Sequence, residues 1–121
     1  MKINLKGTNI ELTVEIRNYL DRRLDGVSKF LPKDNEAFIV DVELGRTTKH
    51  HQAGDIFRAE INVVIGDKSF RAVSERADLY SAIDDMKDEI TRELGSYKEK
   101  RISLVKRSGQ KLKQLIRRLY K

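Results

Sequence analysis

Residues 77–100 read ADLYSAIDDMKDEITRELGSYKEK, and the rest of the chain is organised around this stretch. Its apolar residues recur every three or four positions, at Leu79, Ile83, Met86, Ile90, Leu94 and Tyr97. That spacing places one continuous apolar stripe on a single face of an α-helix. Asp78 is the expected N-cap, because its short side chain can accept a hydrogen bond from a free backbone N–H of the first turn. The stretch therefore predicts a long amphipathic helix that covers an apolar surface.

The N-terminal part of the chain supplies a strand and a second helix. Residues 1–7 alternate apolar and polar side chains, which is typical of a half-buried strand. Thr13 is the expected N-cap of a helix that ends before Pro32. The apolar positions of this helix again have helical spacing: Ile16, Leu20, Leu24, Val27 and Leu31.

Three further strand patterns lie between the two helices. Residues 37–44 and 57–65 alternate in period two, and residues 45–54 between them read as a loop. Gly66-Asp67 then separates the second of these strands from residues 68–74, and a two-residue connection with glycine first indicates a type II′ hairpin. The predicted register pairs Val63 with Phe70, Ile61 with Ala72 and Asn62 with Arg71.

The order of these patterns predicts an α+β fold. Strand, helix, three strands and helix form a two-layer sandwich, β-α-β-β-β-α, with a four-stranded sheet and both helices packed on one face. The other face of the sheet then meets water. A length of 121 residues suits one compact domain, which we place at residues 1–101, followed by a basic C-terminal tail at 102–121.

The positive charge of the chain is concentrated at its C-terminal end. The net charge is +6, and residues 98–121 hold ten Lys or Arg with one acid, Glu99, so this segment carries +9 and the preceding residues −3. A basic terminal segment on a near-neutral domain favours a polyanionic partner, most often nucleic acid. A tail that only improves solubility is the alternative.

The tail pattern predicts a short basic amphipathic helix after Ser108-Gly109. We interpret it as an auxiliary RNA-binding arm that folds as a helix on docking. A helix that lies on a membrane surface is the competing interpretation, but the segment contains no Trp or Phe. The cations of this arm are Lys106, Arg107, Lys111, Lys113, Arg117 and Arg118.

The sequence offers no pattern for catalysis or for a metal centre. The chain has no cysteine, and its two histidines, His50 and His51, are adjacent in the predicted loop rather than spaced as metal ligands are. Three helical acids, Asp84, Asp85 and Asp88, are more simply read as solvent-facing residues near a helix N-terminus. Nucleophile-elbow and phosphate-loop motifs are absent from the sequence. We therefore expect no enzyme, no cofactor, no metal and no small-molecule substrate.

Hydropathy favours a cytoplasmic protein. No apolar run approaches the length of a membrane span, and the N-terminus reads directly into a strand pattern rather than into a signal peptide. We therefore expect no membrane association.

Two stretches of the chain resemble the ribosome hibernation promoting factor family, whose short members are called ribosome-associated inhibitor A and which is also known as the sigma-54 modulation protein family. The first is NIELT at residues 9–13 with the helix that follows, similar to an Ile-Glu-Val-Thr entry into the first helix of the family. The second is DLYSAID at residues 78–84, close to Asp-Met-Tyr-x-Ala-Ile-Asp. The resemblance covers residues 1 to 101.

The resemblance implies a fold like that of a double-stranded-RNA-binding domain with an added first strand. It implies binding to the small ribosomal subunit, in the channel of messenger RNA and of the A- and P-site transfer RNAs, by a protein that keeps ribosomes inactive under stress or in stationary phase. The alternative is a non-ribosomal nucleic-acid-binding or transcription-modulating protein on the same fold. We expect a monomer when the protein is free.

Cations on both predicted helices are the candidate ribosomal RNA contacts. Helical spacing places several of them on outward faces or beside the apolar stripes. The resemblance implies an RNA-binding role for five of them: Arg17, Arg23, Arg92, Lys98 and Lys100. The chain departs from the family pattern at Glu89, where the family usually has lysine, and at Glu93, where it often has glutamine. The family also often has lysine near Gly26, so part of the expected basic surface is missing or reversed in sign. The predicted RNA-binding residues are Arg17, Arg22, Arg23, Lys29, Lys87, Arg92, Lys98, Lys100 and Arg101.

Overall fold

The computed structural model describes residues 2–33, 37–47 and 54–119, with side chains described up to Lys100. The predicted element order is confirmed. The elements are β1 (Ile3–Thr8), α1 (Val14–Ser28), β2 (Phe38–Thr47), β3 (Ile56–Ile65), β4 (Lys68–Arg76) and α2 (Leu79–Leu119).

The four strands form one sheet in the order β1-β2-β3-β4. β1 runs parallel to β2, and α1 provides the crossover that a parallel pair requires. The other two neighbouring pairs are antiparallel. The hairpin between β3 and β4 has the predicted register, with Val63 opposite Phe70. Gly66 has a φ of 59° and Asp67 has no positive φ, as a type II′ turn requires.

Both helices begin at the N-caps that the sequence predicted. The Thr13 hydroxyl accepts a hydrogen bond from the Ile16 backbone N–H at 3.2 Å, and the Asp78 carboxylate accepts one from the Ser81 N–H at 3.1 Å. Each bond satisfies a donor that has no partner within its helix. The caps fix where α1 and α2 start relative to the sheet.

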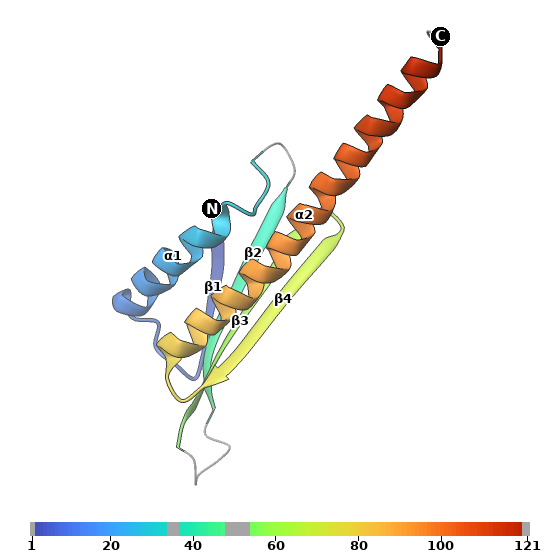
Figure 1. Cartoon of the computed structure of the whole chain (residues 1–121). Coiled ribbons are helices and arrows are strands. Elements are labelled where there is room, and N and C mark those ends of the chain that lie inside the picture. The colour runs from blue at the N-terminus through green and yellow to red at the C-terminus, as the bar shows by residue number, and fades with distance from the viewer. Residues whose placement is uncertain (1, 34–36, 48–53, 120–121) are drawn as a thin grey trace.

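The two helices cover one face of the sheet, as Figure 1 shows. The core lies between these layers and combines the apolar stripes of the helices with the inward side chains of β2, β3 and β4. Leu20 and Leu24 of α1 and Ile83, Met86 and Ile90 of α2 are at most 1% exposed. The predicted two-layer sandwich, with its helices on one face, is confirmed.

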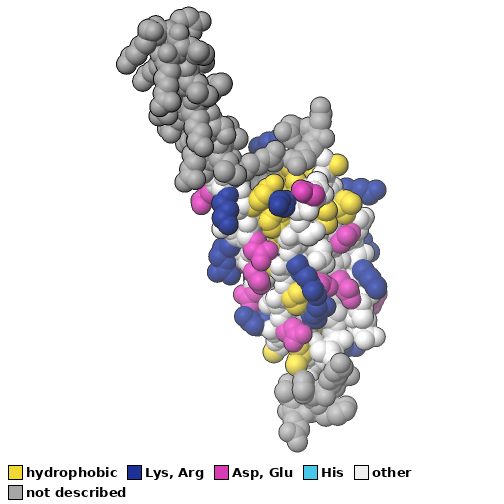
Figure 2. Space-filling model, turned by 90° about the vertical axis from the view of Figure 1, so that its right-hand side faces the viewer, with side chains coloured by type: hydrophobic (Ala, Val, Ile, Leu, Met, Phe, Trp, Pro, Cys, Tyr) yellow, Lys and Arg dark blue, Asp and Glu magenta, His cyan; other side chains and the backbone are white. Residues whose placement is uncertain are grey.

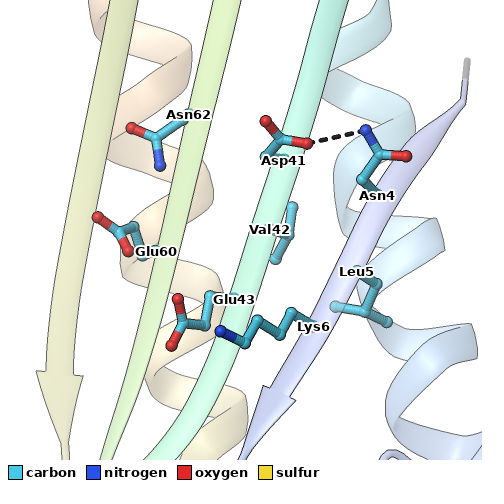
Figure 3. A pocket seen from close by; sticks show the side chains of 8 residues that line it. All are labelled: Asn4, Leu5, Lys6, Asp41, Val42, Glu43, Glu60 and Asn62. Atoms are coloured by element: carbon cyan, nitrogen blue, oxygen red, sulfur yellow. Dashed lines mark hydrogen bonds between the residues drawn. The ribbon is translucent and has the colours of Figure 1, made fainter.

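The opposite face of the sheet is open and carries alternating polar side chains. Two arginines cover the Glu60 side chain on this face, so that only 12% of it is exposed. Its carboxylate accepts a hydrogen bond from Arg71 Nε at 2.6 Å and lies 3.5 Å from Arg58. A hollow of about 240 Å³ lies on this face. Figure 3 shows its lining side chains, among which the Asn4 amide donates a hydrogen bond of 2.8 Å to Asp41. Its ionisable lining residues are the acids Asp41, Glu43 and Glu60 and the single cation Lys6.

Helix α2 is longer than the sequence predicted. It runs for 41 residues to Leu119, and its C-terminal part extends past the end of the sheet (Figure 1). The prediction of a separate short helix after Ser108-Gly109 is therefore wrong, since Gly109 lies inside α2. A single glycine costs only about 1 kcal/mol within a helix, and the strong helix formers around it outweigh that cost.

Strand β2 also exceeds its predicted end and continues to Thr47. Ladder pairing with β3 explains the extension, because Arg46 and Thr47 face Phe57 and Ile56 across the two strands. Residues 48–53 of the predicted loop, including His50 and His51, lie outside the described residues. Among the described helices, none has the length and apolar character needed to cross a membrane.

Candidate nucleic-acid interface

A polar cluster joins the outer edges of α1 and α2. The Tyr19 hydroxyl donates a hydrogen bond of 2.6 Å to Asp84, and Arg23 Nε lies 2.9 Å from the same carboxylate. Arg23 also donates to the Tyr19 hydroxyl oxygen, at 3.1 and 3.2 Å. The Tyr80 ring completes the group by meeting the Tyr19 ring edge-on, with centroids 4.7 Å apart. We call these four residues the interhelix cluster.

The charges in the interhelix cluster stabilise one another. The hydrogen bond to Asp84 is the main reason that the pKa of Tyr19 is raised above its usual value, and burial adds to it. The hydrogen bond to Tyr19 and the charge of Asp84 together raise the pKa of Arg23. Arg23 also lies over the Tyr19 ring, 5.2 Å from its centroid. Both shifts favour the protonated forms, which a tyrosine and an arginine already adopt at neutral pH.

The two stretches that carry the family resemblance meet in this cluster. Tyr19 and Arg23 lie one turn apart on α1, and Tyr80 and Asp84 lie one turn apart on α2. Such i, i+4 pairs share a helix face. Part of the DLYSAID motif therefore serves to hold the two helices together.

Replacing Asp84 with Ala is expected to lower the free energy of unfolding by about 1 kcal/mol. The substitution removes a charge-assisted hydrogen bond and an ion pair, and the ion pair is worth little because Arg23 and Asp84 are 46% and 38% exposed. Urea unfolding measures the change. Asp88→Ala is the control, since Asp88 is 67% exposed and its ion pair with Lys87 is long, at 3.8 Å. Equal losses in the two variants would contradict a structural role for Asp84.

Further cations line the same junction between α1 and α2. Arg22 borders an open hollow of about 280 Å³ beside Tyr19 and Arg23. Nearer the C-terminal end of α1, Lys98 Nζ donates to the Lys29 carbonyl oxygen at 3.3 Å and lies 6.0 Å from the centre of the Phe30 ring. These contacts place cations from both helices along one junction.

Lys87 lies deeper in the junction, with 27% of its side chain exposed. A Cβ atom at Gly26 would come within 3.4 Å of Lys87 Cε. The glycine therefore gives the lysine stem room between the helices. A side chain at Gly26 would have to share this space with Lys87.

The remaining predicted cations lie elsewhere. Arg92 and Lys100 border a hollow on the side of α2 that faces β4. Arg17 lies on the edge of α1 away from the interhelix cluster, because its position is about 160° around the helix from Tyr19. Side-chain positions for Arg101 and for the tail cations, Lys106 to Arg118, lie outside what the structure describes. The structure thus divides the predicted residues into a junction group, a β4-side group and Arg17.

Ion pairing separates the available cations from those that are already engaged. Arg23 pairs with Asp84 and Lys87 with Asp88. Within the described part of the chain, the other predicted cations form no ion pair: Arg17, Arg22, Lys29, Arg92, Lys98 and Lys100. These six can contact phosphate without first losing an acidic partner.

Acidic residues limit the basic character of the β4 side of α2. Asp85 pairs with Arg76 of β4 at 2.6 Å, and Glu89 and Glu93 lie on the same flank of the helix. Figure 2 shows Lys and Arg side chains interleaved with Asp and Glu over this side of the molecule. The open face of the sheet is no better suited to a polyanion, because acids dominate its hollow. The helix junction is therefore the better candidate for an RNA contact.

The three helical acids are engaged in different contacts. Asp84 belongs to the interhelix cluster, whereas Asp85 and Asp88 pair with Arg76 and Lys87. Across the described residues, no group of three or more His, Cys, Asp or Glu side chains could hold a metal ion.

The sequence analysis did not include the aromatic residues of the helix junction among the candidate site residues. Tyr19, Phe30 and Tyr80 lie at the helix junction and contact one another or its cations. The spacing of Tyr19 to Arg23 and of Tyr80 to Asp84 was a usable signal, since each is an i, i+4 pair of polar residues at the edge of an apolar stripe.

Comparison with known proteins finds one matching family model over residues 3–102, described as sigma 54 modulation protein / S30EA ribosomal protein. The ribosome hibernation promotion factor of Picosynechococcus sp. is 33% identical over 83% of this chain, which spans half the length of that relative. The ribosome hibernation promoting factor of Pseudomonas putida is 31% identical, over 87% of this chain and 94% of its own length.

Solved protein structures are also similar to this chain. The N-terminal domain of Thermus thermophilus Protein Y matches 80% of this chain and 99% of its own, with a TM-score of 0.66 and 30% identity. A ribosomal subunit interface protein from Coxiella burnetii matches 82% of this chain and 99% of its own with a TM-score of 0.65, and at 17% identity it supports the fold alone.

Proposed function

Because the chain belongs to the sigma 54 modulation protein / S30EA ribosomal protein family, we propose that it is a ribosome hibernation factor. In this proposal it binds the small ribosomal subunit in the channel of messenger RNA and of the A- and P-site transfer RNAs. It holds the ribosome inactive under stress by occupying that channel. The relatives named as hibernation factors support the assignment.

The observation that carries the proposal is the set of unpaired cations on two adjacent helices. Arg22 and Lys29 come from α1 or its C-terminal end, and Lys98 comes from α2. These two helices cover the face of the sheet opposite the acidic hollow (Figure 1). Cations held at fixed spacing on a rigid surface suit a folded RNA backbone, whose phosphates are likewise fixed.

The proposed action is binding without chemistry. The ribosome is blocked because protein fills the space that messenger RNA and transfer RNA need. The interhelix cluster supports this role indirectly, since it fixes α1 against α2 and therefore sets the distance between their cations. Inhibition should then require about one protein per ribosome.

The C-terminal part of α2 is proposed as an auxiliary RNA-binding arm. Residues 101–119 continue α2 and extend about 28 Å at 1.5 Å per residue. The segment from residue 98 carries +9, whereas the preceding residues carry −3. An arm of this charge compensates for the acids Glu89 and Glu93 on the domain.

Sedimentation with purified small ribosomal subunits tests the proposal. The double variant Arg22→Ala/Lys98→Ala is expected to bind about tenfold or more weakly, because each substitution removes a charged contact to phosphate. Lys2→Ala/Lys6→Ala removes the same charge from β1 and its flank, and should bind as the unaltered chain does.

Two results would count against the proposal. One is equal binding by both double variants. The other is that the unaltered chain fails to sediment with small subunits yet binds promoter DNA or a transcription factor, which would favour the transcription-modulating alternative. A separate titration tests the mode of action: inhibition of translation far below one protein per ribosome would indicate catalysis instead of occupation of the channel.

A further inference from the structure

A second surface, separate from the helix junction, combines aromatic rings with cations. Phe70, near the start of β4, meets Tyr97 of α2 with ring centroids 5.1 Å apart and planes inclined at 61°. The two rings border an open hollow of about 420 Å³. The rest of its lining comes from one flank of α2. We call this surface the aromatic notch; its residues are Phe70, Arg92, Glu93, Ser96, Tyr97 and Lys100.

The aromatic rings of the notch are only partly buried. Phe70 packs its inner side against the core, and both Phe70 and Tyr97 keep part of their surface in solvent. Figure 2 shows hydrophobic side chains gathered towards the upper end of this side of the molecule. Edge-to-face packing of one ring on the other leaves a ring face free to stack on a third planar group.

The polar residues of the notch are exposed around the rings. Arg92 and Lys100 are exposed, and neither forms an ion pair with any described residue. Glu93 is exposed between them along the helix. A phosphate can be held by the two cations, while a carboxylate accepts hydrogen bonds from the amino group of a nucleobase. The rings, the cations and the carboxylate of the notch therefore suit the face of a base, its adjoining phosphate and its amino group, respectively.

We propose that the aromatic notch binds one unpaired RNA nucleotide, with the base stacked on Phe70 and Tyr97 and the adjoining phosphate held by Arg92 and Lys100. Glu93 accepts a hydrogen bond from the exocyclic amine of the base, which favours adenine over uracil. That the nucleotide is RNA rests on the proposed function. The stacking site itself rests on the contacts within the notch.

The chemistry of the notch favours a nucleotide over other occupants. An acidic peptide would satisfy Arg92 and Lys100 but would leave the rings without a planar group to stack on. Aromatic side chains with flanking cations are the usual means of holding single-stranded nucleic acid, because every base offers a π-face. The notch thereby explains why Arg92 and Lys100 lie apart from the junction cations.

Fluorescence anisotropy with labelled RNA hexamers tests the proposal in the full chain. Phe70→Leu and Tyr97→Leu keep apolar bulk but remove the stacking surface, so each is expected to weaken binding of oligoadenylate by about tenfold or more. An abasic hexamer with the same phosphates should bind weakly and equally to all variants. Phe57→Leu is the matched control, since Phe57 is a partly buried core aromatic at the other end of the β3–β4 ladder.

Nuclear magnetic resonance supplies a direct readout of the site. Ring-proton signals of Phe70 and Tyr97 should shift when oligoadenylate is added, shift less with oligouridylate, and stay in place with the abasic hexamer. Equal binding of oligoadenylate by the leucine variants and the unaltered chain would overturn the proposal. Ring signals that respond to an acidic peptide and not to oligoadenylate would also overturn it.

The test separates the notch from the proposed function. If the leucine variants lose oligoadenylate binding while the unaltered chain fails to sediment with small subunits, the notch stands and the ribosomal assignment fails. If the chain sediments and the leucine variants bind oligoadenylate unchanged, the ribosomal assignment stands and the notch fails.

Discussion

Ile83→Ala is expected to lower the free energy of unfolding by about 2 to 5 kcal/mol, the usual cost of emptying a buried aliphatic position. Ile83 is fully buried in the apolar stripe of α2, where that stripe packs on the sheet. A domain of this size is stable by about 5 to 15 kcal/mol, so the loss is a large fraction of the total. Thermal and urea unfolding of the purified variant measure it.

Arg92→Ala provides the comparison on the same helix. Arg92 is exposed, and among the described residues it has no ion-pair partner, so its removal should change stability by about 0.5 kcal/mol or less. Binding to small ribosomal subunits should weaken instead. If Arg92→Ala lowered the melting temperature as much as Ile83→Ala does, the arginine would be structural and its place among the RNA contacts would be wrong.

Raising the salt concentration from about 50 to about 200 mM is expected to weaken ribosome binding by an order of magnitude or more. Each phosphate that a Lys or Arg neutralises releases counterions, with a slope of about −0.7 in log affinity against log salt for single-stranded contacts. About three such contacts already give a tenfold loss over this range. Sedimentation with small subunits across a salt series measures the slope.

A chain truncated after Arg101, measured over the same salt series, shows how much the arm contributes to binding. The shortened chain should keep its melting temperature, because every residue of the described core precedes residue 95. Its affinity should be lower and its salt slope shallower, since the arm cations are gone. Salt-insensitive binding by the full chain would contradict an electrostatic interface. An unchanged slope after truncation would show that the arm makes no phosphate contact, and aggregation would show that the arm covers an apolar edge.

The sequence by itself determined the secondary structure and the layers of this protein. The period of the apolar residues located the strands and both helices, and the caps at Thr13 and Asp78 located the helix starts. The Gly66-Asp67 turn was enough to set the β3–β4 register. These features are local, because they depend on backbone preferences and on which side of one element is apolar.

Local patterns misplaced the ends of several elements, and the ends of β2 and α2 show why. The end of β2 depends on its pairing with β3, a partner that is distant in sequence. Gly109 reads as a break when it is considered alone, but the helix formers on both sides carry α2 through it to Leu119. In both places the neighbouring structure outweighs the local signal.

Only the tertiary structure decided which of the predicted cations lie together. On the sequence, Arg23 flanks an apolar stripe and Arg92 points outward, and no partner is indicated for either. Folding places Arg23 against Asp84 and Arg92 beside Phe70 and Tyr97. The same holds for the aromatic residues, whose partners come from another helix or from a strand. Which side chain on another element a residue contacts depends on how the two elements pack. Helical periodicity shows on which face of its own helix a residue lies, but not which residues of a neighbouring element contact that face.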